Sequence, residues 1–463
     1  MLKLTNTLTG ATEPFTPADG KTVRLYACGP TVHDFAHIGN FRTFIFEDVL
    51  RRHLKSKWNV LHVMNITDID DKIIRKAAEK DIDIREYTAP YTASFFEDSA
   101  RLRIERPDVV TLATDYIPEM VHLVERLIDS GHAYREGNSI YYRISSFPTY
   151  GRLSKLDKRE LKVGARIDAD EYEKEQPNDF VLWKGPKDDA EKRWDAPFGT
   201  GRPGWHLECS AMAMKHLGET LDIHCGAVDL IFPHHENEIA QSEGVTSKPF
   251  ARFWLHAEHL LVDNAKMSKS KGNFYTLRDL IEKGYSTLAI RYLMLSVQYR
   301  KQLNFTVAGM EQAQNSLGRI KEFLFRLRTA RLMSGSTPEI TEALAAARAS
   351  FEAGLDDDLN TPEALAAIFK LITACHTAMA REALREDDRA AILVWFGEVD
   401  QRLAIIPEEE VETRDGEIES LVAQRDEARR NRDFAASDRL RKELLDRGIL
   451  IEDTREGTKW RRK

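Results

Sequence analysis

The feature that most constrains the fold of this chain is an alternation of short apolar segments and amphipathic helices near its N-terminus. Residues 22–28 (TVRLYAC) predict a buried strand, residues 29–40 a polar loop, and residues 41–57 a helix, because their apolar side chains recur at helical spacing. Residues 58–74 predict a second strand that ends in a polar loop at 65–71. This order is typical of a parallel α/β sheet, which binds ligands in the loops after its strands.

The rest of the chain has a different pattern of predicted secondary structure. A helical segment, YIPEMVHLVERLIDSG, precedes short alternating strands and a charged stretch, which indicates an α+β insertion over residues 116–200. After about residue 305 the strand patterns stop, and segments such as TPEALAAIFKLITACHTAMAREAL predict an all-helical bundle. A charged segment, 424–448, predicts one further helix before the final residues. Cys375 falls in an apolar helical stripe and is expected to be core.

Composition restricts the class of protein. The chain has 463 residues, of which 31% are charged and 42% hydrophobic, as in a soluble globular protein of several domains. The net charge of -8 leaves room for a basic patch that binds nucleic acid. We expect no signal peptide and no membrane span, and therefore a cytoplasmic protein. Four cysteines are too few for a disulfide scaffold, so we expect reduced thiols and thiolate ligands.

Residues 204–243 are unusually dense in groups that can bind a metal ion. The groups are His206, Cys209, His224, Cys225, His234, His235, Glu236 and Glu238. Pro233 suits the first turn of a helix, which would end near Gly244. On that helix His234 and Glu238 share a face, and Cys209 is the nearest further ligand. The pattern predicts a metal site but leaves its full ligand set open.

Two short motifs have the composition of a binding site for a nucleoside triphosphate. His37 to Asn40 (HIGN) follow a strand and open a helix, where backbone N–H groups and the helix dipole favour phosphate. Lys266 to Ser270 (KMSKS) form a lysine-rich loop that could neutralise charge as it develops. Either motif alone is weak, since a lysine-rich loop is usually a solvated surface. Together, on either side of an insertion, they indicate a shared site.

This pair of motifs resembles the two signatures of class I aminoacyl-tRNA synthetases. Those enzymes activate an amino acid with ATP on a Rossmann-type domain and pass it to the 3′-terminal adenosine of tRNA. The wider context is similar to the cysteinyl-tRNA synthetase family in the segments YACGPTVHDFAHIGN, MNITDIDDKI, GWHLECSAM, IFPHHENEIAQSEG, AKMSKSKGN and DDDLNTPEAL. The similarity extends from about residue 4 to the C-terminal KWRR.

The resemblance implies a domain organisation. The fold class would be α/β, with a Rossmann-type parallel-sheet catalytic domain, an α+β insertion, an all-α bundle and a small C-terminal domain. The expected segments are the first catalytic half 1–115, the insertion 116–200, the second catalytic half 201–250, the KMSKS loop and stem-contact region 251–305, the bundle 306–406 and an anticodon-binding module 415–463.

The resemblance also implies site residues. A single zinc ion per chain would be held by Cys28, Cys209, His234 and Glu238. The catalytic residues would be His37, Lys266 and Lys269, and ATP would bind at His37, Gly39, Asn40, Lys266, Met267, Ser268, Lys269 and Ser270. The cysteine substrate would contact Thr31, Trp205 and Asp229. One departure is Asn40, which replaces the second signature histidine and carries no positive charge.

Some roles stay open. We expect His206, His224, His235 and Cys225 to contact the metal ligands or line the pocket, with direct ligation as the alternative. Trp205 could instead belong to the core, and Asp229 could cap a turn. A soft thiolate binds zinc well whereas a serine hydroxyl does not, so the metal would select cysteine over serine.

The expected reaction ligates L-cysteine to tRNA(Cys) through a cysteinyl-adenylate and uses ATP with Mg²⁺. We expect the enzyme to be a monomer. One alternative is the cysteine ligase of mycothiol synthesis, which shares the first half of this pattern. The bundle and the basic residues around Trp460 favour an RNA acceptor instead. A second alternative is a non-catalytic zinc-dependent RNA-binding paralogue, against which Lys266 and Lys269 argue.

Overall fold

The structure, a computed structural model, describes residues 1–155, 179–186, 192–268, 272–407, 416–454 and 457–462. The chain divides into two compact units, Met1–Ile406 and Pro407–Lys463. Much of the charged stretch expected within the insertion lies outside the described residues, as do Lys269 and Ser270 of the KMSKS motif.

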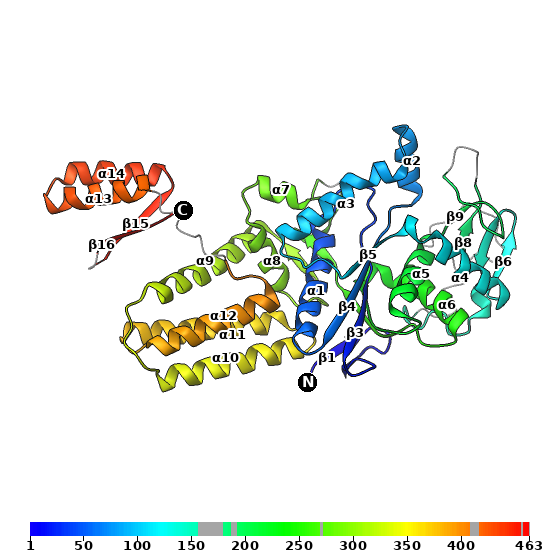
Figure 1. Cartoon of the computed structure of the whole chain (residues 1–463), viewed down its shortest axis with the longest axis horizontal. Coiled ribbons are helices and arrows are strands. Elements are labelled where there is room, and N and C mark those ends of the chain that lie inside the picture. The colour runs from blue at the N-terminus through cyan, green and yellow to red at the C-terminus, as the bar shows by residue number, and fades with distance from the viewer. Residues whose placement is uncertain (156–178, 187–191, 269–271, 408–415, 455–456, 463) are drawn as a thin grey trace. The chain divides into compact units, whose positions relative to one another are not determined.

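The centre of the first unit is a parallel sheet of five strands (Figure 1). In order across the sheet they are β11 (Ala251–Ala257), β10 (Leu221–Ala227), β3 (Thr22–Ala27), β4 (Asn59–Ile66) and β5 (Val109–Leu112). All neighbouring pairs are parallel, which confirms the expected α/β fold. The chain winds outward from β3 in both directions, so a crevice is expected at the carboxyl ends of β3 and β10.

Helices cover both faces of this sheet. Helix α1 (Ile38–Lys55) packs on one face, and α5 (Trp205–Leu217) and α6 (Glu236–Thr246) lie on the other. The strands serve both layers because side chains alternate between the faces. In β3, Leu25 therefore joins the core around α1, while Tyr26 joins the core under α5 and α6.

Two further helices follow β4. They are α2 (Asp71–Glu79) and α3 (Ile84–Arg101). Aromatic side chains join α3 to α1, since the rings of Phe44 and Phe95 lie 4.9 Å apart in an edge-to-face arrangement. Such contacts add to the free energy gained from burying the rings.

The insertion contains α4 (Ile117–Asp129) and a four-stranded antiparallel sheet. Its strands are β6 (Ala133–Glu136), β7 (Ser139–Tyr142), β8 (Phe180–Lys184) and β9 (Arg202–Pro203). The Tyr142 hydroxyl donates a 2.9 Å hydrogen bond to the Ala240 carbonyl of α6. This contact ties the insertion to the helix layer below the main sheet.

Short elements connect the sheet to the bundle. They are the hairpin β1 (Lys3–Asn6) and β2 (Ala11–Pro14), the strands β12 (Leu260–Val262), β13 (Ala265–Lys266) and β14 (Leu303–Phe305), and the helices α7 (Leu277–Glu282) and α8 (Thr287–Leu295). Strand β12 pairs with both β13 and β14. The small sheet thus holds the first residue of the KMSKS motif at the end of β13.

The bundle contains α9 (Val307–Thr329), α10 (Pro338–Asp356), α11 (Thr361–Ala380) and α12 (Glu386–Leu403), as Figure 1 shows. Cys375 is fully buried among its apolar residues, which confirms the expected core position. Among the described helices, α11 alone is long and apolar enough to cross a membrane. Because α11 packs against α10 and core helices pass the same test, this is weak evidence for a span.

The C-terminal unit has two helices and a hairpin. They are α13 (Gly416–Arg430), α14 (Phe434–Asp446), β15 (Ile449–Thr454) and β16 (Gly457–Arg462). The prediction of one helix over 424–448 was therefore wrong. Arg432 has a φ of 62°, and the Asp433 carboxylate accepts a 3.0 Å hydrogen bond from the Ala436 N–H as the N-cap of α14. A short polar N-cap residue favours a new helix start over continuation.

A buried ion pair joins α1 to the bundle. Arg291 of α8 is fully buried and donates to the Asp48 carboxylate of α1 and to the Leu102 and Leu403 carbonyls. Asp48 also accepts a 2.8 Å hydrogen bond from the Glu105 N–H. These contacts fix α1, the end of α3 and the end of α12 at a single guanidinium.

We predict that Asp48→Ala lowers the free energy of unfolding by about 3–5 kcal/mol, because it leaves the Arg291 charge buried without a carboxylate partner. The measurement is the first transition in urea. The matched control is Glu322→Ala, which removes a surface ion pair with Arg326 on α9 and is expected to cost about 0–1 kcal/mol. Equal shifts in the two variants would show that the buried pair has no special role.

Candidate active site

A cavity of about 510 Å³ lies at the carboxyl ends of β3 and β10. It is lined by most of the residues that the sequence suggested for substrate binding, namely Cys28, Thr31, His37, Gly39, Asn40, Trp205, Asp229, Lys266 and Met267. Ligands of open α/β sheets bind at this position in the fold. Residues as far apart as 28 and 267 in the chain therefore share one site.

The HIGN motif forms the first turn of α1. His37 is the N-cap, and its Nδ1 accepts a 3.2 Å hydrogen bond from the Asn40 N–H. The Asn40 side-chain oxygen in turn accepts a 3.1 Å hydrogen bond from the His37 N–H. This reciprocal capping box turns the amide oxygen of Asn40 toward the backbone. Asn40 therefore orders the start of the helix, where the helix dipole favours phosphate.

The segment that carries KMSKS contacts the start of α1. The Ile38 N–H donates a 3.0 Å hydrogen bond to the Tyr275 carbonyl, and the rings of His37 and Phe274 lie 5.2 Å apart. A Cβ at Gly39 would lie 3.0 Å from the terminal carbon of Met267 and 3.0 Å from the His37 ring. Glycine is thus what lets the two motifs approach this closely.

The described part of KMSKS is ordered by local bonds. The Ser268 N–H donates a 2.9 Å hydrogen bond to the Asn273 side chain, which also donates to the Lys266 carbonyl at 3.3 Å. Lys266 is exposed and lines the cavity. An exposed lysine here can reach a bound polyphosphate. Lys269 and Ser270 lie outside the described residues.

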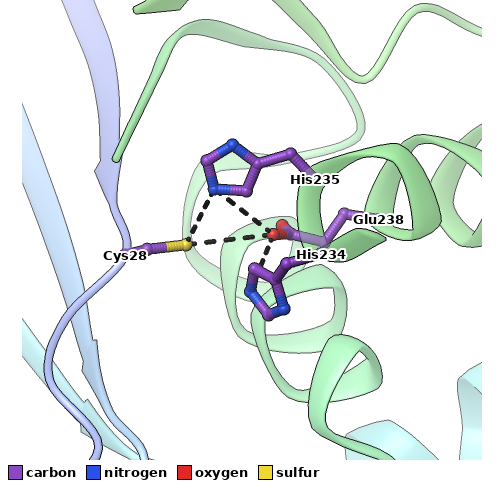
Figure 2. A group of neighbouring side chains, drawn as sticks. All are labelled: Cys28, His234, His235 and Glu238. Carbon is purple, nitrogen blue, oxygen red and sulfur yellow. Dashed lines mark hydrogen bonds and ion pairs between the residues drawn. The ribbon is translucent and has the colours of Figure 1, made fainter. Parts of the chain in front are cut away.

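Four buried side chains that can bind a metal ion gather beside this cavity. Figure 2 shows Cys28, His234, His235 and Glu238, whose ligand atoms all lie within 4.8 Å of one another. The Cys28 sulfur lies 3.8 Å from Oε1 of Glu238, and the His234 Nε2 lies 3.1 Å from the same oxygen. A fifth group is close, because the sulfur atoms of Cys28 and Cys209 lie 3.8 Å apart.

These separations fit a tetrahedral zinc ion. Zinc bound to two thiolates at about 2.3 Å would hold the sulfur atoms roughly 3.8 Å apart, as for Cys28 and Cys209. Nitrogen and carboxylate ligands at about 2.0–2.2 Å would lie roughly 3.4 Å apart, close to the spacing of His234 and Glu238. Cysteine, histidine and carboxylate are also the donors that zinc prefers. The donor set therefore fits the metal.

Two side chains, His235 and Cys209, are candidates for the fourth metal ligand. His235 Nε2 lies 3.3 Å from the Cys28 sulfur and 3.9 Å from Oε1 of Glu238. Its Nδ1 lies 2.8 Å from Nε2 of His256, the kind of outer partner that metal-bound histidines have. Cys209 instead supplies a second sulfur. Both side chains are buried.

Two other histidines, His206 and His224, contact potential metal ligands. His206 Nδ1 lies 2.9 Å from His234 Nδ1, which leaves the Nε2 of His234 directed at Glu238. His224 Nε2 lies 2.9 Å from Oε2 of Glu238, the oxygen that does not face Cys28. Both contacts fix the orientation of a ligand side chain.

Cys225 does not belong to this group, so the expectation that it lines the pocket was wrong. Along β10, His224 points to the layer of α5 and α6, and Cys225 points to the opposite face, in the core around α1. The pleat of a strand sends neighbouring side chains to opposite faces. Adjacency in sequence therefore misled the prediction.

Burial shifts the ionisation of the cluster toward neutral forms. It raises the pKa of the Cys28 thiol and of the Glu238 carboxyl well above their usual values. It lowers the pKa of His234 and His235 well below the usual histidine value, so both imidazoles are neutral and their nitrogens can bind metal. A divalent cation among these groups would favour the ionised thiol and carboxylate, as metal sites do.

The residues suggested for the substrate lie on three elements around the cluster. Trp205 opens α5, is 41% exposed and stacks on His234 with ring centroids 4.2 Å apart. It is therefore not a core residue. Thr31 pairs with Thr67 across the loop ends, and Asp229 lies in the short turn Val228–Leu230. All three line the cavity beside the metal-binding group.

The helix that carries His234 and Glu238 begins later than expected. Pro233 lies in the irregular turn Ile231–His235, and α6 runs from Glu236 to Thr246. Phe232 has extended angles, φ -138° and ψ 130°, which separates the turn from a regular helix. The i,i+4 spacing still brings His234 and Glu238 together because the chain is helical from His234 onward.

Sequence reasoning missed two sets of polar partners. One is His256 at the end of β11, whose Nδ1 lies 2.8 Å from the Thr7 hydroxyl. The other runs through Asn65 and Thr67: the Gly29 N–H donates to Asn65, and the Thr67 hydroxyl donates a 3.0 Å hydrogen bond to buried Glu208. These residues lie at the carboxyl ends of strands, and that position could have identified them in the sequence.

Comparisons with known proteins agree with this geometry. The family model described as tRNA synthetases class I (C) catalytic domain matches residues 14–315. A DALR domain matches residues 350–399, and a cysteinyl-tRNA ligase anticodon binding domain matches residues 414–461. A solved methionyl-tRNA synthetase of Mycobacterium tuberculosis has a TM-score of 0.59 at 13% identity, over 80% of this chain and 87% of its own. The fold and site thus define a class I aminoacyl-tRNA synthetase.

Curated relatives identify the family within this class of synthetases. A cysteine–tRNA ligase of Solibacter usitatus is 50% identical over 100% of both chains. Another from Koribacter versatilis is 46% identical, again over 100% of both chains. The chain belongs to the cysteine–tRNA ligase family, whose members join cysteine to tRNA.

We predict that Gly39→Ala lowers kcat/KM for ATP by about tenfold or more, because the new methyl group pushes Met267 and His37 away from their positions. The measurement is ATP-dependent activation of cysteine. The control is Gly397→Ala in α12, where an added Cβ meets nothing within 4 Å and activity should stay unchanged. A Gly39→Ala enzyme as active as the wild type would refute the close approach of the two motifs.

Proposed function

We propose that the chain makes a cysteinyl-adenylate from L-cysteine and ATP in the cavity at β3 and β10, and then transfers the cysteinyl group to the 3′-terminal adenosine of tRNA(Cys). The observation that carries this proposal is the meeting of HIGN, the start of KMSKS and a cluster of potential metal ligands around one cavity. Both steps need positioning and charge stabilisation more than a protein nucleophile.

The zinc ligands in this proposal are Cys28, Cys209, His234 and Glu238. Bound there, zinc supplies a soft Lewis acid that holds a thiolate far better than a hydroxyl. We assign the fourth position to Cys209 because its sulfur lies 3.8 Å from that of Cys28, the expected edge of a tetrahedral site. His235 then orients Cys28 through its 3.3 Å contact.

The rest of the cysteine pocket is assigned to Thr31, Trp205 and Asp229. Trp205 stacks on His234, is 41% exposed and lines the cavity, so it would cover the substrate side chain. The Asp229 carboxylate suits the ammonium group of the amino acid, and the Thr31 hydroxyl suits its polar atoms. These groups hold and orient the substrate without taking part in bond making.

The ATP site is assigned to the two motifs. The contributing residues are His37, Gly39, Asn40, Lys266, Met267, Ser268, Lys269 and Ser270. The catalytic residues are His37, Lys266 and Lys269, which would stabilise the charge that develops on the phosphates, together with Mg²⁺ on the triphosphate. Asn40 donates only through its amide, since its oxygen accepts from the His37 backbone.

We assign the remaining segments to tRNA. In this proposal residues 251–305 contact the acceptor stem and residues 415–463 bind the anticodon, as a cytoplasmic monomer. The exposed basic side chains at the end of α13, Arg429 and Arg430, suit phosphate contacts. A cysteine ligase for an amino sugar resembles only the first half of this chain, whereas two relatives that match along the whole chain are cysteine–tRNA ligases.

We predict that Cys209→Ser loses zinc and weakens cysteine binding by about tenfold or more, while ATP binding is spared. A serine hydroxyl stays protonated and is a poor zinc ligand. The measurement is zinc content of the purified protein together with cysteine affinity.

The paired variant is His235→Gln, which keeps a polar side chain at the other claimant for the fourth position. We expect its zinc content to stay near one per chain. Loss of zinc in His235→Gln with retention in Cys209→Ser would reverse the ligand assignment.

The test of the whole proposal has two arms. Purified protein should exchange pyrophosphate into ATP only when cysteine is present, which reports the adenylate. The chain truncated before residue 415 should keep that exchange but charge tRNA(Cys) at least tenfold more slowly, because the anticodon module is gone. Full charging by the truncated chain would remove the role of that module, and absence of exchange would favour a non-catalytic paralogue.

A further inference from the structure

A second cavity, of about 240 Å³, lies between α1, α3 and β4. Helix α1 lines it with Phe44, Glu47 and Arg51, which the spacing i, i+3, i+7 puts on one helix face. Strand β4 adds His62 and Met64, which point to the α1 side of the sheet. We call this space the α1–α3 cavity.

Two titratable side chains that line the α1–α3 cavity have no hydrogen-bond partner among the described residues. Glu47 is 1% exposed, and both of its carboxylate oxygens lack a partner there. His62 is 3% exposed, and both of its ring nitrogens lack one. An unpaired carboxylate is costly to bury, so a group of this kind without a partner points to a missing cation or donor.

The neighbouring charges are already paired. Arg51 contacts the Asp108 carboxylate at 2.8 Å and donates to the Arg106 carbonyl, and Asp48 is held by Arg291. Glu105, which also lines the cavity, pairs with Lys55 at 2.9 Å. Glu47 is therefore the one carboxyl group of the cavity lining without a cationic partner among the described residues. Burial raises the pKa of the Glu47 carboxyl and lowers the pKa of His62 to about 3. The neutral His62 ring has one nitrogen that can accept a hydrogen bond.

The walls suit an aromatic ring. The ring of Phe95 lies 4.9 Å from that of Phe44 and 5.2 Å from that of Phe96, and Arg106 lies 4.1 Å from the Phe96 ring centre. An engineered apolar cavity of roughly 150 Å³ in another protein holds benzene. The larger α1–α3 cavity has room for one ring and a short polar group.

We propose that the α1–α3 cavity is a second ligand site, which takes a small molecule with one aromatic ring and a primary amine. The ring packs against Phe44, Phe95 and Phe96. The ammonium group donates to the Glu47 carboxylate and to the free nitrogen of His62. An ammonium satisfies both buried acceptors at once, which a neutral hydroxyl or an anion does not.

The site is separate from the catalytic cavity but shares a wall with it. Phe44 and Phe95 line both spaces. Thr43, one residue before Phe44, lines only the catalytic cavity. A ligand in the α1–α3 cavity would therefore touch the reverse side of the wall beside the ATP motif, without contacting the proposed zinc ligands.

The test uses benzylamine as the probe, titrated calorimetrically into the full chain. A saturating non-hydrolysable analogue of cysteinyl-adenylate fills the catalytic cavity during the titration. We expect saturable binding of one benzylamine per chain. Benzyl alcohol, the neutral isostere, should bind at least tenfold more weakly, and so should benzylamine to Glu47→Gln. The control Glu342→Gln, on the exposed face of α10, should bind benzylamine like the wild type.

A second variant tests the cavity without changing its charge. Ser99→Leu, on the buried face of α3, fills the space and should abolish benzylamine binding while Glu47 is intact. Equal affinities for benzylamine and benzyl alcohol would overturn the proposal, as would unchanged binding in both Glu47→Gln and Ser99→Leu. Absence of saturable binding to the wild type would show that the cavity holds water alone.

Discussion

The arrangement of the catalytic half depends on one buried carboxylate, that of Glu238. Its Oε1 faces His234 and Cys28, and its Oε2 is held by His224. These partners come from α6's entry turn, the end of β3 and the middle of β10. Burying a carboxyl group costs free energy unless polar groups such as these surround it. The two halves of the sheet, separated in sequence by the insertion, therefore converge on this side chain.

The chemistry of selection follows from that convergence. Apolar packing separates substrates that differ by a methylene by only about 1–3 kcal/mol, which is little for two amino acids as alike as cysteine and serine. A soft metal ion beside Cys28 would bind the sulfur of cysteine in preference to the oxygen of serine. Because Trp205 stacks on His234 and also lines the cavity, the side chain proposed to cover the substrate borders the same cavity as the two motifs.

The sequence was most informative where chemistry is local. Strand, loop and helix around HIGN follow from apolar spacing, and the pairing of His234 with Glu238 follows from i,i+4 geometry. The association of Cys28 with that pair required a family resemblance, because a contact across 206 residues has no local pattern. Cys225 was misjudged because adjacency hides the pleat of β10, and the break at Arg432 was missed because charged helical patterns look continuous. Glu47 and His62 left no sequence signal, since their lack of partners is a property of packing alone.

Helix α1 connects two distant events. Its 18 residues span about 27 Å, with His37 capping one end and Asp48 meeting Arg291 and the bundle beyond its midpoint. His37 and Asp48 thus belong to one continuous helix, so the cap beside the cavity and the ion pair with α8 share a backbone. Neither contact can be repositioned without the helix that carries the other.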